Sequence, residues 1–241
     1  MPQLPRAILF DLDDTIIAAY GRPELAWTVV VGEFARELGM STPLVVDAIG
    51  VAARTFWSDT ERHRIWRQKM DEARREIVAR GFAVLARAGH KVPPAELQIR
   101  LADRFSAYRN ENLQLYPGAH ATIDTLRASG VKLALITNGA SEHQRDKIVR
   151  FELSHRFDHI QIEGEYGFGK PEPRAYVHAM ERLGTGPHAT WIVGDNLEWE
   201  VIAPQKLGLH AIWYDPLGDG LPDGHAAKPD RIIRTLGELL A

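Results

Sequence analysis

Short apolar runs alternate with helical patterns along most of the chain, and this alternation restricts the fold more than any other feature. Three runs, Ala7–Phe10, Val131–Ile136 and Trp191–Val193, are mostly apolar and too short for helices. Such runs are typical of strands buried on both faces of a parallel sheet. His159–Ile162 and His210–Tyr214 are weaker candidates for further strands. The sequence therefore predicts an α/β fold.

The predicted helices of this α/β part end at glycines, which are common at helix C-termini. Helical patterns cover Ala119–Ser129, Pro173–Leu183 and Leu197–Leu207, and a glycine follows each. The segment Asp215–Asp230 is rich in Gly, Pro and Asp and predicts a surface loop. A final helix is expected over Arg231–Leu240.

One long stretch interrupts the alternation. From about Pro23 to Leu115 the apolar residues recur at helical spacing and strand signals are nearly absent. We therefore predict a helical domain at residues 19–115, inserted into a core formed by residues 1–18 and 116–241. Pro23 opens its first predicted helix, which closes at Gly39 and has an apolar side made of Leu25, Val29, Val30, Phe34 and Leu38.

Charge and composition exclude several classes of protein. The 241 residues include 29 Lys and Arg against 32 Asp and Glu, a net charge of −3, which provides no broad basic surface for nucleic acid or an anionic membrane. Cysteine is absent, so disulfides, thiolate metal sites and cysteine nucleophiles are excluded. No apolar stretch approaches the roughly 18 residues of a membrane span, and the first residues lack the apolar region of a signal peptide. We expect a cytoplasmic protein.

Polar residues of particular kinds follow the three strong strand candidates directly. Asp11 follows the first, Thr137 and Asn138 follow the second, and Gly194 and Asp195 follow the third. In open α/β sheets, ligands bind outside the carboxyl ends of the strands. These residues are therefore expected to converge on one crevice.

The first polar group contains two carboxylates, Asp11 and Asp13, close enough in sequence to serve one reacting centre as nucleophile and acid/base. The alternative is a cluster that caps a helix N-terminus. Lys170 is interpreted as a cation fixed beside the crevice, with Pro171 and Pro173 setting its position. The alternative for Lys170 is an ordinary solvated loop lysine.

In this order the polar groups resemble the haloacid dehalogenase (HAD) superfamily of hydrolases. The first motif of that family, DxDxT, is matched by Asp11, Asp13 and Thr15, and the second by Thr137. The third is matched by Lys170 in GKPEP, and the fourth by Gly194 and Asp195. The resemblance implies a Rossmann-like, doubly wound parallel core. The helical insertion resembles the C1 cap of subfamily I.

The resemblance also implies a mechanism. Asp11 would attack a phosphoryl group and become an aspartyl phosphate, while Asp13 would protonate the leaving oxygen and then activate water. Mg²⁺ would bind Asp11, the backbone carbonyl of Asp13 and Asp195. The phosphoryl oxygens would be bound by Thr137, the backbone of Asn138 and Lys170.

One departure concerns the fourth motif. Glu200 stands where the family usually has a second aspartate, and its side chain is one methylene longer. It is predicted as a metal-site residue that acts through water.

The predicted insertion contains a charge-dense segment, Glu61–Arg80, in which Trp66, Met70, Ala73 and Ile77 recur at helical spacing and are expected to face the interior. Its arginines are interpreted as a solvated helix face, or alternatively as contacts for an anionic substrate.

The function expected from these residues is a magnesium-dependent phosphatase of a small phosphorylated metabolite, without nucleic-acid or membrane partners. A phosphomutase would use the same residues. A 2-haloacid dehalogenase would share the nucleophile but needs no leaving-group acid at Asp13, and a non-catalytic binding protein would need none of these groups.

Overall fold

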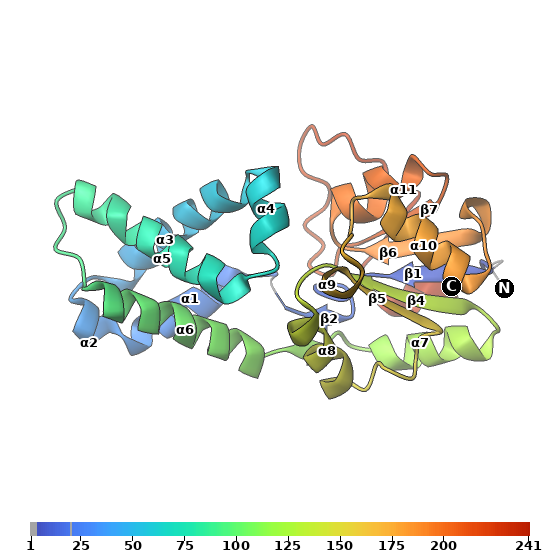
Figure 1. The fold of residues 1–241 in the computed structure, drawn as a ribbon, viewed down its shortest axis with the longest axis horizontal. Coiled ribbons are helices and arrows are strands. Elements are labelled where there is room, and N and C mark those ends of the chain that lie inside the picture. The colour runs from blue at the N-terminus through green and yellow to red at the C-terminus, as the bar shows by residue number, and fades with distance from the viewer. Residues whose placement is uncertain (1–3, 20) are drawn as a thin grey trace. The chain divides into compact units, whose positions relative to one another are not determined.

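The computed structural model describes residues 4–19 and 21–241 (Figure 1). Its contacts divide the chain into two compact units. One contains Gln114–Ala241 together with the described residues up to Ala19, and the other contains residues 21–113. The predicted domains also take in residues 1–3 and 20, which lie outside the described residues.

A six-stranded sheet forms the centre of the first unit, and all its strand pairs are parallel. The strand order is β5-β4-β1-β6-β7-β8, so the chain builds outwards from β1 on one side and then on the other. The bounds are Ala7–Phe10 for β1, Lys132–Thr137 for β4, His159–Ile162 for β5, Thr190–Gly194 for β6, His210–Tyr214 for β7 and Arg231–Ile233 for β8. This arrangement confirms the predicted α/β class with a doubly wound parallel sheet.

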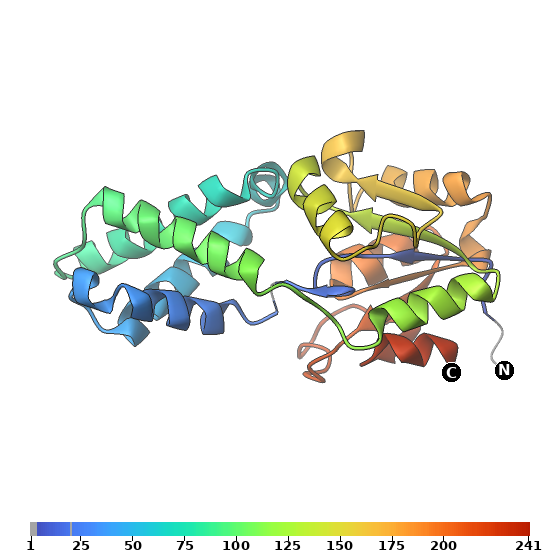
Figure 2. The same ribbon diagram turned by 90° about the horizontal axis from the view of Figure 1, so that it is seen from below.

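Helices cover both faces of this sheet, as Figure 2 shows. Helix α7 (Ala119–Ala128) and the C-terminal 3-10 helix η3 (Leu236–Leu240) pack together on one face. Helix α10 (Pro173–Leu183) lies on the other, where Tyr176 and Ala179 join strand residues in one apolar cluster. The shorter helices lie in the connections: α8 at Ser141–Arg150, α9 at Glu163–Tyr166, η1 at Pro187–Ala189, the π-helix η2 at Leu197–Ile202, and α11 at Ala203–Gln205.

The second unit is helical and has its own apolar core. In this core the ring of Trp27 stacks on that of Phe105, with 3.6 Å between the centroids. Its helices are α1 at Pro23–Glu33, α2 at Ala35–Leu38, α3 at Thr42–Trp57, α4 at Thr60–Trp66, α5 at Met70–Arg87 and α6 at Ala95–Glu111. Within the described part of the chain, no helix has the length and apolar character needed to cross a membrane.

Two short strands of the first unit flank this helical segment in the sequence. Strand β2 (Ile17–Ala18) precedes it and pairs antiparallel with β3 (Gln114–Leu115), which follows it. The chain therefore leaves and re-enters the first unit at neighbouring points.

The expected first helix of the insertion differs from the observed one. Helix α1 ends at Glu33, and α2 continues to Leu38. Leu25 and Val29 are exposed, because the buried side of α1 is formed by Ala26, Trp27, Val30 and Val31. This helix is apolar on most of its circumference, so the spacing of apolar residues did not identify the buried side.

The predicted final helix over Arg231–Leu240 is wrong. Arg231–Ile233 instead forms β8, which pairs with β7 at the edge of the sheet. A new turn of helix starts after Thr235, whose side chain forms a capping box with Glu238. Two adjacent isoleucines suit a strand, because they are β-branched and point to opposite faces.

The strand assignment predicts different roles for these two isoleucines. Ile233 is fully buried and Ile232 is 44% exposed. We expect Ile233→Ala to lower the free energy of unfolding by about 2 to 5 kcal/mol. Ile232→Ala is the matched control and should cost less than about 1 kcal/mol. Urea unfolding of both variants measures the difference, and equal losses would contradict the observed register.

Candidate active site

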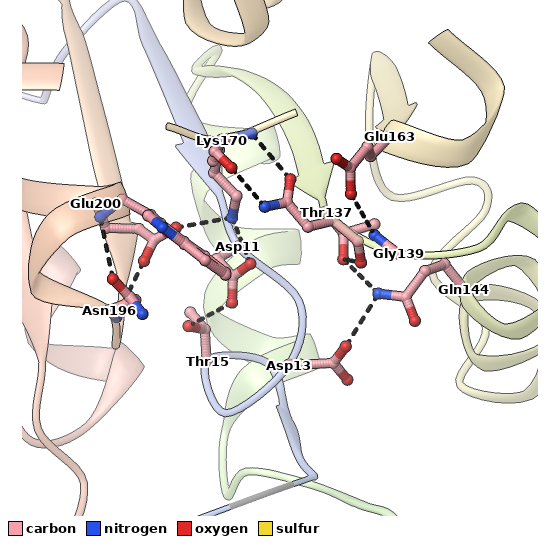
Figure 3. Close-up of polar contacts among 12 residues, drawn as sticks. Asp11, Asp13, Thr15, Thr137, Gly139, Gln144, Glu163, Lys170, Asn196 and Glu200 are labelled. Carbon is pink, nitrogen blue, oxygen red and sulfur yellow. Dashed lines mark hydrogen bonds and ion pairs between the residues drawn. The ribbon is translucent and has the colours of Figure 1, made fainter. Parts of the chain in front are cut away.

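The site is centred on Asp11, the first residue after β1. Its backbone N–H donates to the carbonyl of Val193, 3.0 Å away, which continues the pairing with β6 by one residue. Its carboxylate Oδ2 accepts a hydrogen bond of 3.0 Å from the Thr15 hydroxyl. Asp11 therefore lies at the carboxyl end of the central strand with its side chain fixed (Figure 3).

The segment after Asp11 is a tight turn rather than the start of a helix. The N–H groups of Ile16 and Ile17 both donate to the carbonyl of Leu12. Asp14 adopts a left-handed conformation, with φ of 60°, and its carboxylate accepts from the N–H of Ala19. The aspartates therefore do not cap a helix, and this alternative is excluded.

Lys170 is the cation of the site. Its side chain is 1% exposed, and Nζ lies 2.5 Å from Asp11 Oδ1 and 2.7 Å from Glu200 Oε1. Burial alone would lower the pKa of Lys170, but the two carboxylates outweigh it and raise the pKa. Lys170 thus remains charged, and the alternative of a solvated loop lysine is excluded.

The side chain of Asn138 holds the backbone of Lys170. Asn138 Nδ2 donates to the Lys170 carbonyl at 2.7 Å, and the Lys170 N–H donates to Asn138 Oδ1 at 2.9 Å. A side chain at Gly169 would overlap Asn138 Oδ1, so only glycine allows this approach. Because its side chain is engaged in this way, Asn138 can contact a ligand through its backbone N–H.

Glu200 belongs to the π-helix η2, where it is fully buried. Besides the Lys170 contact of Oε1, its Oε2 accepts a hydrogen bond of 3.0 Å from the Asn196 N–H. Asn196 also caps the helix, since its Oδ1 accepts from two backbone N–H groups of the first turn. Both oxygens of Glu200 are thus engaged within the protein. The Glu200 side chain, one methylene longer than that of aspartate, thus reaches the Lys170 ammonium.

Asp195 is positioned through its backbone, because the indole N–H of Trp213 donates to its carbonyl at 2.6 Å. Desolvation, followed by the nearby charges of Asp11 and Glu200, raises the pKa of the Asp195 carboxyl well above its usual range. Burial likewise raises the pKa of Asp11, and it raises that of Glu200 to about 7. Asp11 and Glu200 both contact the Lys170 ammonium, and their charges act on Asp195 nearby.

The side chains predicted at the metal site are Asp11, Asp195 and, through water, Glu200, while Asp13 is predicted to contribute its backbone carbonyl. Among the described residues, no group of three or more Asp, Glu or His side chains is arranged to hold a metal ion. Glu200 contacts Lys170, and Asp13 contacts a different lysine. Asp11 shares the Lys170 contact through Oδ1, while its Oδ2 accepts from the Thr15 hydroxyl.

Asp13 contacts two residues that the sequence analysis missed, both on α8. Lys147 Nζ donates to its two carboxylate oxygens at 2.7 and 2.8 Å, and Gln144 Nε2 donates to Oδ2 at 2.9 Å. Gln144 Nε2 also donates to the hydroxyl of Thr137, the last residue of β4. A sequence signal existed, since a glutamine and a lysine three residues apart on the helix after Thr137 share one face.

The arginines of the charge-dense segment are largely paired inside the helical unit. Three of them contact acidic partners on the same helix: Arg64 with Glu61, Arg74 with Asp71, and Arg80 with Glu76. Arg75 binds Asp103 of α6 through two hydrogen bonds. A solvated face fits the exposed side chains of Arg64, Arg75 and Arg80, but Arg67 is 8% exposed and does not belong to it. 

The absence of a side chain at Gly194 sets the position of Glu200. A Cβ atom at Gly194 would overlap the Glu200 side chain, whereas one at Gly186 would meet nothing within 4 Å. Gly194→Ala should therefore lower the free energy of unfolding by about 1 to 3 kcal/mol. The control Gly186→Ala should stay within about 0.5 kcal/mol of the parent. Thermal unfolding of the two variants measures this, and equal stability would show that Glu200 can move aside freely.

The chain is similar to known hydrolases over most of its length. Residues 5–208 match the haloacid dehalogenase-like hydrolase family. The chain is 33% identical to a phosphoserine phosphatase from Thermus thermophilus, over 90% of this chain and 78% of the relative. It is 26% identical to a glyceraldehyde 3-phosphate phosphatase from Methanopyrus kandleri, over 97% of this chain and 98% of the relative.

A solved structure agrees with these relatives. The HAD-hydrolase YfnB from Bacillus subtilis, in a structure bound to magnesium, superposes with a TM-score of 0.70 at 25% identity, covering 98% of this chain and 97% of that one. The helical insertion is consistent with the predicted C1-capped subfamily. The resemblance found in the four motifs is confirmed, and the chain belongs to the haloacid dehalogenase-like hydrolases.

Proposed function

We propose that this protein hydrolyses small phosphate monoesters through an aspartyl-phosphate intermediate on Asp11, with Mg²⁺ bound beside it. The observation that carries the proposal is the Asp11 carboxylate, fixed at the end of the central strand between the Lys170 ammonium and the Thr15 hydroxyl. Family membership makes the chain a hydrolase. The phosphatase names of the relatives support phosphate monoesters as the substrate class.

In the first step, a carboxylate oxygen of Asp11 attacks phosphorus. The new bond joins Asp11 to the phosphoryl group, and the bond from phosphorus to the ester oxygen breaks. Asp13 enters this step in its protonated form and gives that proton to the leaving oxygen, which leaves Asp13 as a carboxylate. In the second step, Asp13 takes a proton from water as the water oxygen attacks phosphorus, which releases phosphate and restores Asp11.

The phosphoryl oxygens require donors that face the carboxyl end of the sheet. We assign this role to the Thr137 hydroxyl, the Asn138 backbone N–H and the Lys170 ammonium. These groups come from rigid elements, because Thr137 ends a buried strand and Asn138 is bonded to the backbone of Lys170. Donors fixed in advance stabilise the charge that develops in the transition state.

The residues present fit a magnesium ion. Their donors are oxygens. The carboxyl groups of Asp11, Asp195 and Glu200 outnumber the Lys170 ammonium, so a further cation would offset their repulsion. We assign the ion to Asp11, Asp195 and the backbone carbonyl of Asp13. When bound, Mg²⁺ supplies positive charge that neutralises phosphoryl oxygens. A site with two carboxylates suits Mg²⁺, which usually keeps several waters.

Asp13 also discriminates between reactions of the family. A dehalogenase needs no acid for its leaving group, whereas an ester oxygen does. A phosphomutase would use the same groups and differ in whether water or a second hydroxyl accepts the phosphoryl group. We favour hydrolysis because the two curated relatives are named as phosphatases.

We further propose that the helical unit acts as the cap and limits the substrate to small metabolites. The even charge balance agrees, since it provides no basic surface for a nucleic acid. The lack of cysteine supports a cytoplasmic location.

A variant at Asp11 provides the direct test. Asp11→Asn should abolish phosphate release from a panel of sugar, acid and nucleotide monophosphates assayed with Mg²⁺, while circular dichroism stays unchanged. The exposed Asp223, changed to Asn, is the control and should keep full activity. Near-parental activity of Asp11→Asn would refute the mechanism.

The metal assignment predicts unequal effects of two neighbouring acids. Asp195→Asn removes a direct ligand, whereas Glu200→Gln changes a side chain whose oxygens already contact Lys170 and Asn196. We expect the loss of Mg²⁺ affinity for Asp195→Asn to exceed that for Glu200→Gln by about tenfold or more. Isothermal titration with MgCl₂ measures both. Equal losses would identify Glu200 as a direct ligand.

A further inference from the structure

We propose that Gln144 and Lys147 of α8 are positioning residues that hold the side chain of Asp13 in place for proton transfer. This inference rests on the acid/base role of Asp13 in the proposed function. Neither residue belongs to the four motifs found in the sequence.

The contacts to Asp13 are close and involve both of its oxygens. Lys147 Nζ lies 2.7 Å from Oδ1 and 2.8 Å from Oδ2, and Gln144 Nε2 lies 2.9 Å from Oδ2. Lys147 Nζ also donates to Gln144 Oε1 at 2.8 Å, so the two residues on α8 fix each other. The three side chains form one closed set of hydrogen bonds.

The burial of these two residues is unusual for their types. Gln144 is 3% exposed and Lys147 is 8% exposed. A buried ammonium is costly unless it is paired, and the Asp13 carboxylate is the partner that compensates it here. The lysine therefore has a fixed place, unlike a lysine on a solvated helix face.

Asp13 needs such support because of where it lies. It belongs to the turn after β1, where its side chain is 19% exposed. A proton donor displaced by about 1 Å from its reacting atom loses much of its effect. Held by α8, the carboxylate has one orientation relative to Asp11.

Gln144 also connects these hydrogen bonds to Thr137, which we assign to phosphoryl binding. Its Nε2 donates to the Thr137 hydroxyl oxygen at 2.5 Å. The remaining contact of that hydroxyl, to the Asn138 carbonyl, is long at 3.5 Å. The Thr137 proton is thereby left to donate to a phosphoryl oxygen. One helix thus places the proton donor and a phosphoryl-binding hydroxyl together (Figure 3).

The test compares two substrates that differ in their need for an acid. An alkyl phosphate needs protonation of its leaving oxygen, whereas p-nitrophenyl phosphate needs little. We expect Lys147→Met to lower kcat/KM for the alkyl phosphate by roughly 10- to 100-fold, and that for p-nitrophenyl phosphate by less than about threefold. Asp13→Asn should show the same preference.

A double-mutant cycle then separates positioning from general damage. If Lys147 acts through Asp13, adding Lys147→Met to Asp13→Asn should cause almost no further loss on the alkyl phosphate. Gln144→Met is the second variant, should Lys147→Met fold poorly by circular dichroism. Because Gln144 also contacts Thr137, this variant should lower kcat/KM for both substrates, but more for the alkyl phosphate, and the excess loss should vanish in the Asp13→Asn background. Arg145→Met removes a charge from the same helix that pairs with Glu165, away from Asp13, and should keep parental kinetics.

The outcomes distinguish this inference from the proposed function. Equal losses of Lys147→Met on both substrates, or full additivity with Asp13→Asn, would overturn the positioning role while the acid role of Asp13 stands. If Asp13→Asn itself showed no preference between the substrates, the acid role in the proposed function would fail.

Discussion

The ion pair network around Lys170 is the interaction on which the rest of the site depends. Asp11, directly after β1, and Glu200, in the helix after β6, are buried acids, and each would be strongly destabilised without a cation. The lysine contacts both, so it connects the segment after β1 with the helix after β6. Removing this one charge would leave two buried carboxylates unpaired, which costs more than the pair itself contributes.

The backbone around Lys170 is arranged to keep that charge in place. Asn138 binds both polar groups of the lysine's backbone, and Glu163 accepts a hydrogen bond from the N–H of Gly139. The loops after β4 and β5 are thus joined next to the site. Rigid donors of this kind need no reorganisation during a reaction, which is the physical basis of electrostatic catalysis.

Two lysines therefore pair with two aspartates of the site, one with each. Lys170 balances Asp11, the proposed nucleophile, while Lys147 balances the carboxylate form of Asp13, the proposed acid/base. The two aspartates are only two residues apart, yet they face different partners because the turn after β1 directs them apart. Adjacent acids can take different roles when their surroundings differ.

The sequence by itself indicated five of the six strands of the main sheet and proposed Asp11, Asp13, Thr137, Lys170 and Asp195 as site residues. Short apolar runs and the polar residues that follow them are local features, so spacing reveals them. Only the tertiary structure decided that Arg231–Ile233 is a strand, because its pairing with β7 outweighs local propensity. It also decided the partners: Glu200 reaches Lys170, and Lys147 reaches Asp13. These contacts join residues as far as 134 positions apart, and nothing in local spacing encodes which distant charges meet once the sheet has formed.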